Sequence, residues 1–232
     1  MRNIVIGDTL STNFQFQEAI KTLRTNIQFS GSNVRTVLMT STAPMEGKST
    51  LTWELAVSTA KTGKKVCLID ADIRRSAFHK VHGLKEETVG LSQILSGQIG
   101  LEEAIYKTNI PNLYMTFTGP YTPSPTELFE DENCGRMFAE LKNVGFEQIY
   151  VDTPPLGSVI DAAILAKYAD GFVLVADVGE TKKKALKRVK EQIDKTGVRL
   201  LGVVLNKAPT GKGSYYYGSY YGNYDSYYGK ES

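Results

Sequence analysis

A short loop of small and charged residues has the spacing that binds phosphate. Residues 41–50 read STAPMEGKST, with an apolar run before them and a helical pattern after them. In a strand–loop–helix arrangement of this kind, backbone amides point at phosphate oxygens. Lys48 suits the β- and γ-phosphates, the Ser49 hydroxyl suits Mg²⁺, and Gly47 permits close approach of the backbone. The candidate nucleotide-binding residues are Met45, Glu46, Gly47, Lys48, Ser49 and Thr50.

Aspartates at two strand ends could complete a site for phosphoryl transfer. The loop alone is ambiguous, because the strict P-loop pattern has glycine where Thr42 stands. Asp72 and Asp152 would hold Mg²⁺ directly or through water, and Asp70 would orient or deprotonate the attacking group. The alternative is that these aspartates only cap the helices that follow them. Their occurrence together with the loop favours a phosphate site. The candidate catalytic residues are Lys48, Asp70, Asp72 and Asp152, and the candidate metal ligands are Ser49, Asp72 and Asp152.

Five apolar runs predict the strands that would position these residues. They span residues 37–39, 66–69, 149–151, 172–175 and 200–205. Apolar residues at helical spacing follow the first run, around Leu51 and Leu55, and precede the last run, around Val189 and Ile193. This alternation indicates an α/β fold with a doubly wound, mostly parallel sheet of P-loop architecture, whose ligands bind at the carboxyl ends of the strands.

Composition limits the class of protein. The 232 residues are 41% apolar, so residues 1–209 can bury one large core and form one domain. The formal net charge is only +2, which gives no indication of a nucleic-acid partner. Cys67 and Cys134 lie in separate apolar patterns, so neither a disulfide nor a thiolate metal site is expected. With no long apolar run and no leader pattern, the chain is predicted to be soluble and cytoplasmic.

Two segments flank the predicted sheet. Residues 15–29 predict a helix ahead of the first strand, either an interaction arm or a cap on the sheet. Residues 210–232 contain eight tyrosines, five glycines and four serines, but no Leu, Ile, Val, Met or Phe. Such a segment cannot bury enough aliphatic surface to fold, so we expect a disordered tail, either adhesive or a substrate. Its tyrosines are Tyr215, Tyr216, Tyr217, Tyr220, Tyr221, Tyr224, Tyr227 and Tyr228.

Two comparisons of motifs narrow the kind of P-loop protein. Guanine-specific enzymes carry Asn-Lys-x-Asp after a strand, and the corresponding segment here is Asn206-Lys207-Ala208-Pro209. Because Pro209 replaces the aspartate, ATP is favoured over GTP, with Asn206 a candidate contact to adenine. Partitioning and cell-division ATPases carry a second lysine near the start of the loop, and that position is Ala43 here.

The combination of motifs resembles the bacterial tyrosine kinases, in particular the free-standing cytoplasmic type of capsule and exopolysaccharide synthesis in Gram-positive bacteria. The resemblance covers nearly the whole chain. It is carried by residues 41–49, Asp70-Ala71-Asp72-Ile73-Arg74, Asp152-Thr153-Pro154-Pro155, Arg24-Thr25-Asn26-Ile27, residues 119–128 and the terminal tyrosines. It implies an ATP- and Mg²⁺-dependent tyrosine kinase in which Asp70 accepts the phenol proton and the tail tyrosines are phosphorylated in trans.

The same resemblance implies partners and one assembly surface. These would be a transmembrane adaptor that recruits and activates the kinase at the inner face of the membrane, protein-tyrosine substrates, a cognate phosphatase and further copies of the chain, arranged for example in a ring. The family's Glu-x-x-Arg-x-x-Arg contact motif appears here as Glu18, Lys21 and Arg24. Met45 stands where the family usually has glycine. The alternatives left open are a partitioning-type ATPase switch without kinase activity and a nucleotide-binding scaffold without turnover.

Overall fold

Continuous apolar runs form the centre of the sheet. The computed structural model describes residues 1–7, 10–76, 78 and 88–209. Every residue of the four central strands is buried, as expected of parallel strands covered on both faces. These strands are β2 (Thr36–Ser41), β3 (Val66–Asp70), β6 (Gln148–Asp152) and β7 (Gly171–Asp177). They and β8 (Leu200–Asn206) confirm the five strands predicted from the sequence.

The described residues form one eight-stranded sheet in the order β1-β4-β5-β3-β6-β2-β7-β8. All pairings are parallel except β4 with β5, which confirms a doubly wound, mostly parallel sheet. The sequence did not predict β1 (Arg2–Ile4), β4 (Tyr106–Thr108) or β5 (Leu113–Thr116). Each has only three or four residues and β1 is largely exposed, so their apolar patterns are too short to detect.

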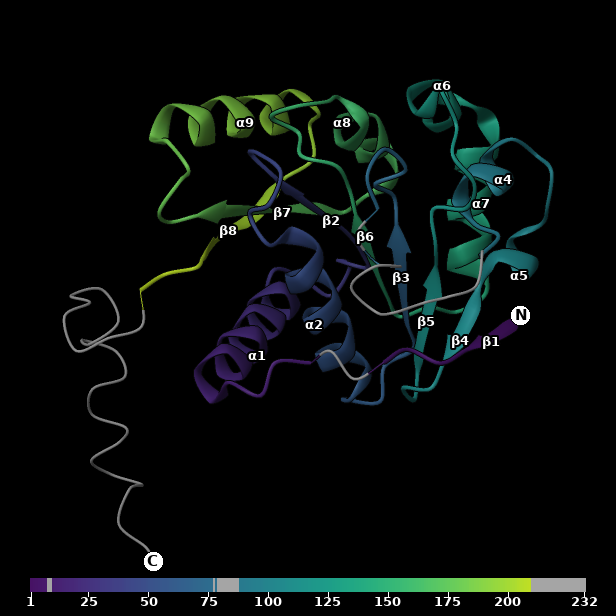
Figure 1. Ribbon diagram of the computed structural model, residues 1–232, viewed down its shortest axis with the longest axis horizontal. Coiled ribbons are helices and arrows are strands. Elements are labelled where there is room, and N and C mark those ends of the chain that lie inside the picture. Colours follow the sequence, from purple (N-terminus) through teal and green to yellow (C-terminus); the bar gives the residue numbers. More distant parts are fainter. Residues whose placement is uncertain (8–9, 77, 79–87, 210–232) are drawn as a thin grey trace, which may run out of the picture.

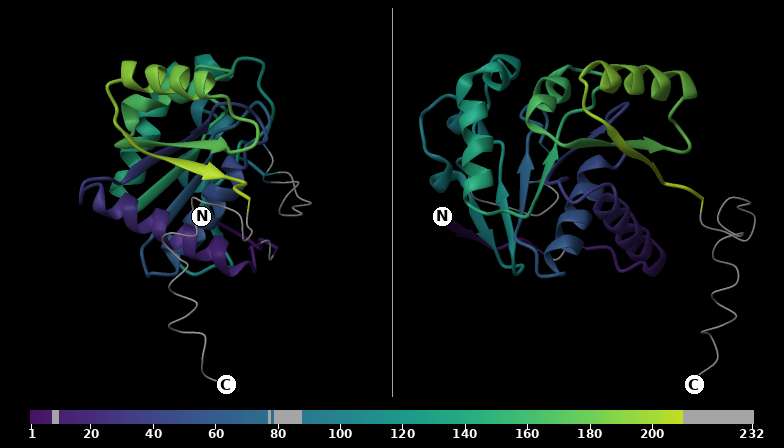
Figure 2. Two further views of the ribbon diagram at one scale, coloured as in Figure 1. Left: turned by 90° about the vertical axis from the view of Figure 1, so that its left-hand side faces the viewer. Right: turned by 180° about the vertical axis from the view of Figure 1, so that it is seen from behind.

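Helices cover both faces of the sheet (Figures 1 and 2). One face packs against α1 (Phe14–Phe29) and α2 (Lys48–Ala60) through residues that include Ile20, Ile27 and Leu55. The predicted helix 15–29 is therefore α1, and it lies against α2 (Figure 1). The other face is covered by the remaining elements, which are α4 (Leu91–Leu95), α5 (Leu101–Ala104), α6 (Pro125–Glu130), α7 (Glu132–Asn143), α8 (Asp161–Leu165), the 3-10 turn at Ala166–Tyr168 and α9 (Lys183–Lys195).

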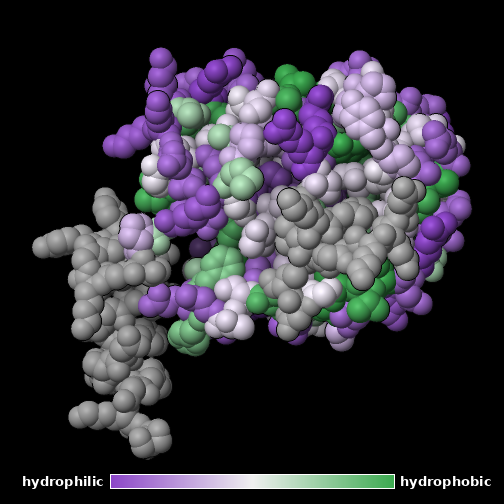
Figure 3. All heavy atoms as spheres, in the orientation of Figure 1, coloured by the Kyte–Doolittle hydropathy of each residue, from purple (hydrophilic) through white to green (hydrophobic). Residues whose placement is uncertain are grey.

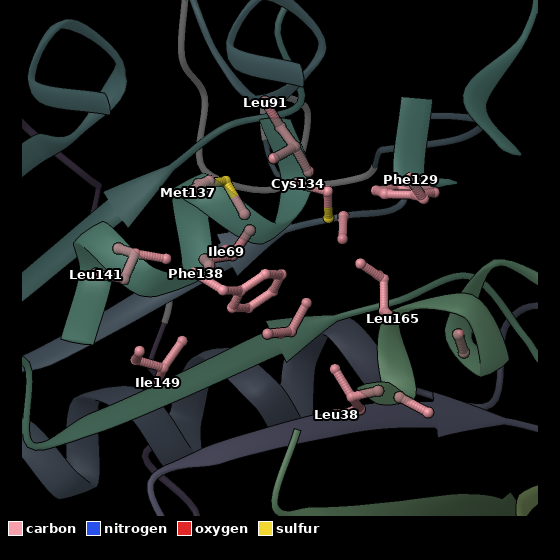
Figure 4. Packing of buried hydrophobic residues seen from close by; sticks show 14 of the residues in the cluster. Leu38, Ile69, Leu91, Phe129, Cys134, Met137, Phe138, Leu141, Ile149 and Leu165 are labelled. Atoms are coloured by element: carbon pink, nitrogen blue, oxygen red, sulfur yellow. The ribbon is translucent and has the colours of Figure 1, made fainter. Parts of the chain in front are cut away.

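The core on this second face is the larger of the two hydrophobic clusters. Phe138 of α7 and Leu165 of α8 belong to this cluster together with Leu38 and Ile149 of the sheet (Figure 4). Cys67 of β3 and Cys134 of α7 are both buried in this cluster, and both are free thiols.

The surface of α9 is strongly hydrophilic. Its lysines 183, 184, 187 and 190 are exposed, and purple side chains gather over this helix in Figure 3. No helix in the described part of the chain is long and apolar enough to cross a membrane.

Candidate active site

The phosphate-binding loop connects β2, in the middle of the sheet, to α2. Gly47 precedes the first residue of α2 with φ +86°, a conformation that a side chain disfavours. A Cβ atom at Gly47 would also lie 2.1 Å from Asn206 Nδ2, so both the backbone conformation and the position of Asn206 favour glycine. The predicted strand–loop–helix context of the P-loop is present.

Lys48 and Asp152 form a buried ion pair at the end of this loop. Lys48 Nζ lies 2.7 Å from Asp152 Oδ1, and the two side chains are 6% and 1% exposed. Lys48 Nζ also lies 3.3 Å from Ser49 Oγ. Thr52, one turn into α2, donates to Asp152 Oδ1 at 3.1 Å. The structure thus brings the candidate lysine, hydroxyl and carboxylate together, with an additional threonine behind them.

The second oxygen of Asp152 fits a hydrated cation. Oδ2 is buried and accepts no hydrogen bond from any residue that the structure describes. A buried carboxylate oxygen normally has a partner, so this atom lacks a group that would complete its coordination. Ser49 and Asp72 supply further oxygen donors of the type that Mg²⁺ prefers. The residues present therefore fit the predicted magnesium site.

Asp70 lies beside Asp152, because β3 and β6 pair these two residues in register. Its carboxylate is fully buried and accepts hydrogen bonds from Ser76 Oγ and from the Asp72 amide. Burial and the neighbouring Asp152 raise the pKa of Asp70 to about 8. Burial also raises the pKa of Asp72. A carboxyl whose pKa lies near neutral pH has the property that a general base requires.

Glu46 does not point its carboxylate outward from the loop. The side chain is 4% exposed and accepts hydrogen bonds from Thr42 N at 2.7 Å, Thr42 Oγ1 at 2.6 Å and Ala43 N at 3.1 Å. It also accepts one from Thr181 Oγ1, in the connection between β7 and α9. The carboxylate therefore ties the loop together, and the part of Glu46 that remains available to a ligand is its backbone.

Three further candidates differ in their surroundings. Asn206, at the end of β8, donates to the Glu46 carbonyl at 2.9 Å. Met45 is 88% exposed and has φ +68°. Thr50 is exposed in the first turn of α2. Asn206 thus contacts the loop from β8, whereas Met45 lies in the loop itself and Thr50 is exposed to solvent.

Comparison with known proteins supplies the family. The CobQ/CobB/MinD/ParA nucleotide binding domain matches residues 37–215. The chain is 40% identical over 208 residues to the tyrosine-protein kinase CpsD of Streptococcus agalactiae, covering 90% of this chain and 89% of that protein. The chain belongs to the bacterial tyrosine kinases.

Solved structures share the fold. The crystal structure of the chimerical protein CapA2B2 superposes on the kinase with a TM-score of 0.81 at 32% identity, covering 90% of this chain and 95% of the other. The septum site-determining protein MinD of Pyrococcus horikoshii OT3, solved with Mg-ADP, has a TM-score of 0.63 at 23% identity over 77% of this chain and 72% of its own. This second likeness shows the shared P-loop fold alone.

The predicted assembly residues of the kinase do not share one environment. Glu18 and Lys21 pair with each other at 2.6 Å on the exposed side of α1. Arg24 instead turns inward, where Nη1 donates to Ser58 O at 2.8 Å and to Ser58 Oγ at 3.0 Å. Arg24 thus docks α1 on α2, and only the other two side chains are presented outward.

The predicted autophosphorylation sites of the kinase are in the C-terminal tail. The eight tail tyrosines, Tyr215 to Tyr228, lie outside the described residues. Sequence reasoning also missed groups that contact the loop, namely Thr52, Thr181 and Lys207. Thr52 could have been found, because it follows Lys48 by four residues and so shares its helix face. No comparable signal indicates Thr181.

Proposed function

We propose that this kinase transfers the γ-phosphoryl group of Mg-ATP to tyrosine hydroxyls, and that its own C-terminal tyrosines are its first substrates. The observation that carries the proposal is the convergence of Lys48, Asp152 and Asp70 at the carboxyl ends of β2, β6 and β3. In parallel α/β sheets this edge is the place where ligands bind. Membership of the tyrosine kinase family supplies the reaction.

Lys48 has two roles that follow from its position. In the structure its ammonium forms an ion pair with Asp152. We propose that the ammonium moves from Asp152 to the phosphates when ATP binds, and that Ser49, Asp72 and Asp152 then hold Mg²⁺. Bound Mg²⁺ would neutralise charge on the β- and γ-phosphates. Lys48 would stabilise the same charge from the loop side.

Asp70 is the proposed proton acceptor. The phenol oxygen of tyrosine forms a bond to the γ-phosphorus, the bond between that phosphorus and the β,γ-bridging oxygen breaks, and ADP leaves. The phenol proton passes to Asp70. A phenol has an ordinary pKa near ~10, so a carboxyl pKa raised to about 8 narrows the gap between donor and acceptor. The main contributions of the site are still positioning and charge stabilisation.

The proposed cellular setting follows from family membership. We propose that the kinase acts in capsular or exopolysaccharide synthesis, in the cytoplasm, and that a transmembrane adaptor brings it to the inner face of the membrane. Copies of the chain would assemble, for example into a ring, through the outer side of α1 that carries Glu18 and Lys21. A cognate phosphatase would reverse the modification. An ATPase switch of the partitioning type is less favoured, because Ala43 lacks the second lysine of that group.

Phosphotyrosine formation in Mg-ATP tests the proposal. Lys48→Met should abolish it, because the phosphate site would lose its buried cation. Lys61→Met, an exposed lysine just beyond the end of the same helix, is the matched control and should leave the reaction unchanged. Phosphotyrosine formation by Lys48→Met at the wild-type rate would refute the proposed site, and ATP hydrolysis by wild-type protein without phosphotyrosine would support the ATPase switch.

A further inference from the structure

Two consecutive residues at the end of β8 hold two consecutive carbonyls of the phosphate loop. Asn206 Nδ2 donates to Glu46 O at 2.9 Å, and Lys207 Nζ donates to Met45 O at 2.8 Å. Lys207 also pairs with Asp177 Oδ2 at 2.7 Å, and Asp177 ends β7 with its side chain only 7% exposed. The ammonium of Lys207 therefore bridges the nearly buried carboxylate of Asp177 and the Met45 carbonyl of the loop.

Because the peptide bond is planar, the direction of each of these carbonyls also fixes the direction of the N–H group that follows it. In a trans peptide the carbonyl and the following N–H point in opposite directions, and the described chain contains no cis peptide. Since the Met45 and Glu46 carbonyls face β8, the N–H groups of Glu46 and Gly47 face away from it. Neither amide donates a hydrogen bond to another described residue. These are groups that a P-loop offers to phosphate.

The backbone at Met45 needs such support. Among the described residues, Met45 (φ +68°), Asn112 and Lys207 (φ +55°) are the non-glycine residues with positive φ. Two of these three hydrogen-bond each other. Positive φ is unfavourable for a residue with a Cβ atom, and it persists where surrounding contacts impose it. The Met45 side chain is 88% exposed, so its packing supplies little of that constraint and its carbonyl contact supplies more.

We propose that Lys207 is a positioning residue for nucleotide binding. It acts through the Met45 carbonyl, which it holds so that the loop amides face the phosphates, and Asp177 anchors it. The role rests on the proposed nucleotide site but adds to it a residue that touches only protein. The loop amides would bind the phosphates equally well before transfer and in the transition state. A variant in which these amides are misaligned should therefore have a higher KM and an unchanged kcat.

Equilibrium binding of a fluorescent ADP analogue with Mg²⁺, together with KM and kcat for ATP, tests the role. Lys207→Met should raise both the Kd and the KM roughly tenfold, with kcat within about twofold of wild type. Asp177→Asn should raise the Kd less, since Lys207 keeps its bond to Met45. Lys195→Met, an exposed lysine at the far end of α9, is the control and should bind like wild type.

Restoring the ammonium at position 207 by chemical modification distinguishes a positioning role of Lys207 from a general loss of structure in the variant. Lys207→Cys should bind the analogue as weakly as Lys207→Met, and alkylation with bromoethylamine should restore binding, because it rebuilds a lysine-like side chain. Cys67 and Cys134 are both 0% exposed, which confines the reaction to position 207. Wild-type affinity in Lys207→Met, or no recovery after alkylation, would overturn the proposal. Wild-type protein that does not bind the analogue would refute the nucleotide site itself.

Discussion

The two oxygens of the buried Asp152 carboxylate have different surroundings. Lys48 neutralises Oδ1, Thr52 donates to the same atom, and Oδ2 is left without a partner in the described chain. A threonine that orients a metal-binding carboxylate acts through that carboxylate and not on the substrate. Its single hydroxyl proton is shared between Asp152 Oδ1 and Lys48 O, which lies 2.8 Å from Thr52 Oγ1.

Thr52→Val should therefore lower the apparent affinity of the site for Mg²⁺ while leaving the fold intact. Valine has nearly the same shape but no donor, so the apparent Mg²⁺ affinity of phosphotransfer should fall roughly tenfold. Thr52→Ser keeps the hydroxyl and should remain close to wild type. Titration of phosphotyrosine formation with Mg²⁺ measures the effect. Equal Mg²⁺ dependence in the valine and serine variants would show that Thr52 does not orient Asp152.

The buried thiol of Cys67 makes stability depend on alkaline pH. Burial raises the pKa of Cys67 from its ordinary value of 9.0 to about 12. Because the folded pKa is raised, the contribution to stability is complete below pH 9.0 and is lost as the pH rises toward about 12. Unfolding by urea across this range should show a decline that is shallower in Cys67→Ala. Identical slopes in the two proteins would contradict this.

At the scale of elements, the length and burial of each strand decided whether it could be predicted from the sequence. The continuous apolar runs of β2, β3, β6 and β7 are the expected signature of strands covered on both faces. The direction in which a single side chain points was harder to predict from the sequence, even on a helix that was correctly predicted. Glu18, Lys21 and Arg24 are spaced to share a face of α1, yet Arg24 is long enough to reach Ser58 across the α1–α2 contact.

This difference within α1 predicts two separable effects. Arg24→Ala should lower the free energy of unfolding by about 1 to 2 kcal/mol, because Arg24 docks α1 on α2. Glu18→Ala with Lys21→Ala should cost less than about 1 kcal/mol, since exposed pairs contribute little, but should dissociate the proposed oligomer. Urea unfolding and light scattering measure the two effects. An oligomer of unchanged mass in the double variant would exclude this side of α1 as the interface.

At the scale of the whole molecule, the motifs predicted the centre of the site but not its supports. Lys48, Asp70 and Asp152 follow strands within recognisable local patterns. Thr181 and Lys207 reach the loop from 135 and 162 residues away along the chain. Contacts at such separations depend on how β7 and β8 pair and where they end, which no local pattern encodes.

Modification of the tail would change the charge of the whole kinase. The chain carries a formal net charge of +2, and each phosphate adds about −1.5 to −2 at neutral pH. We therefore expect several phosphates on the eight tyrosines to reverse the net charge and to weaken the proposed assembly of copies. A chain of 23 residues spans about 75 Å at full extension, a length compatible with the proposed phosphorylation of a neighbouring copy.

The most direct test of the central claim is a mixture of two chains. One carries Lys48→Met and keeps its tail. The other keeps Lys48 but has phenylalanine at all eight tail tyrosines, so any modified tail peptide must come from the inactive chain. After incubation with Mg-ATP, mass spectrometry should find phosphate on Tyr215 to Tyr228 of the Lys48→Met chain. An unmodified tail in that mixture, while wild-type protein modifies itself equally at every dilution, would contradict phosphorylation in trans.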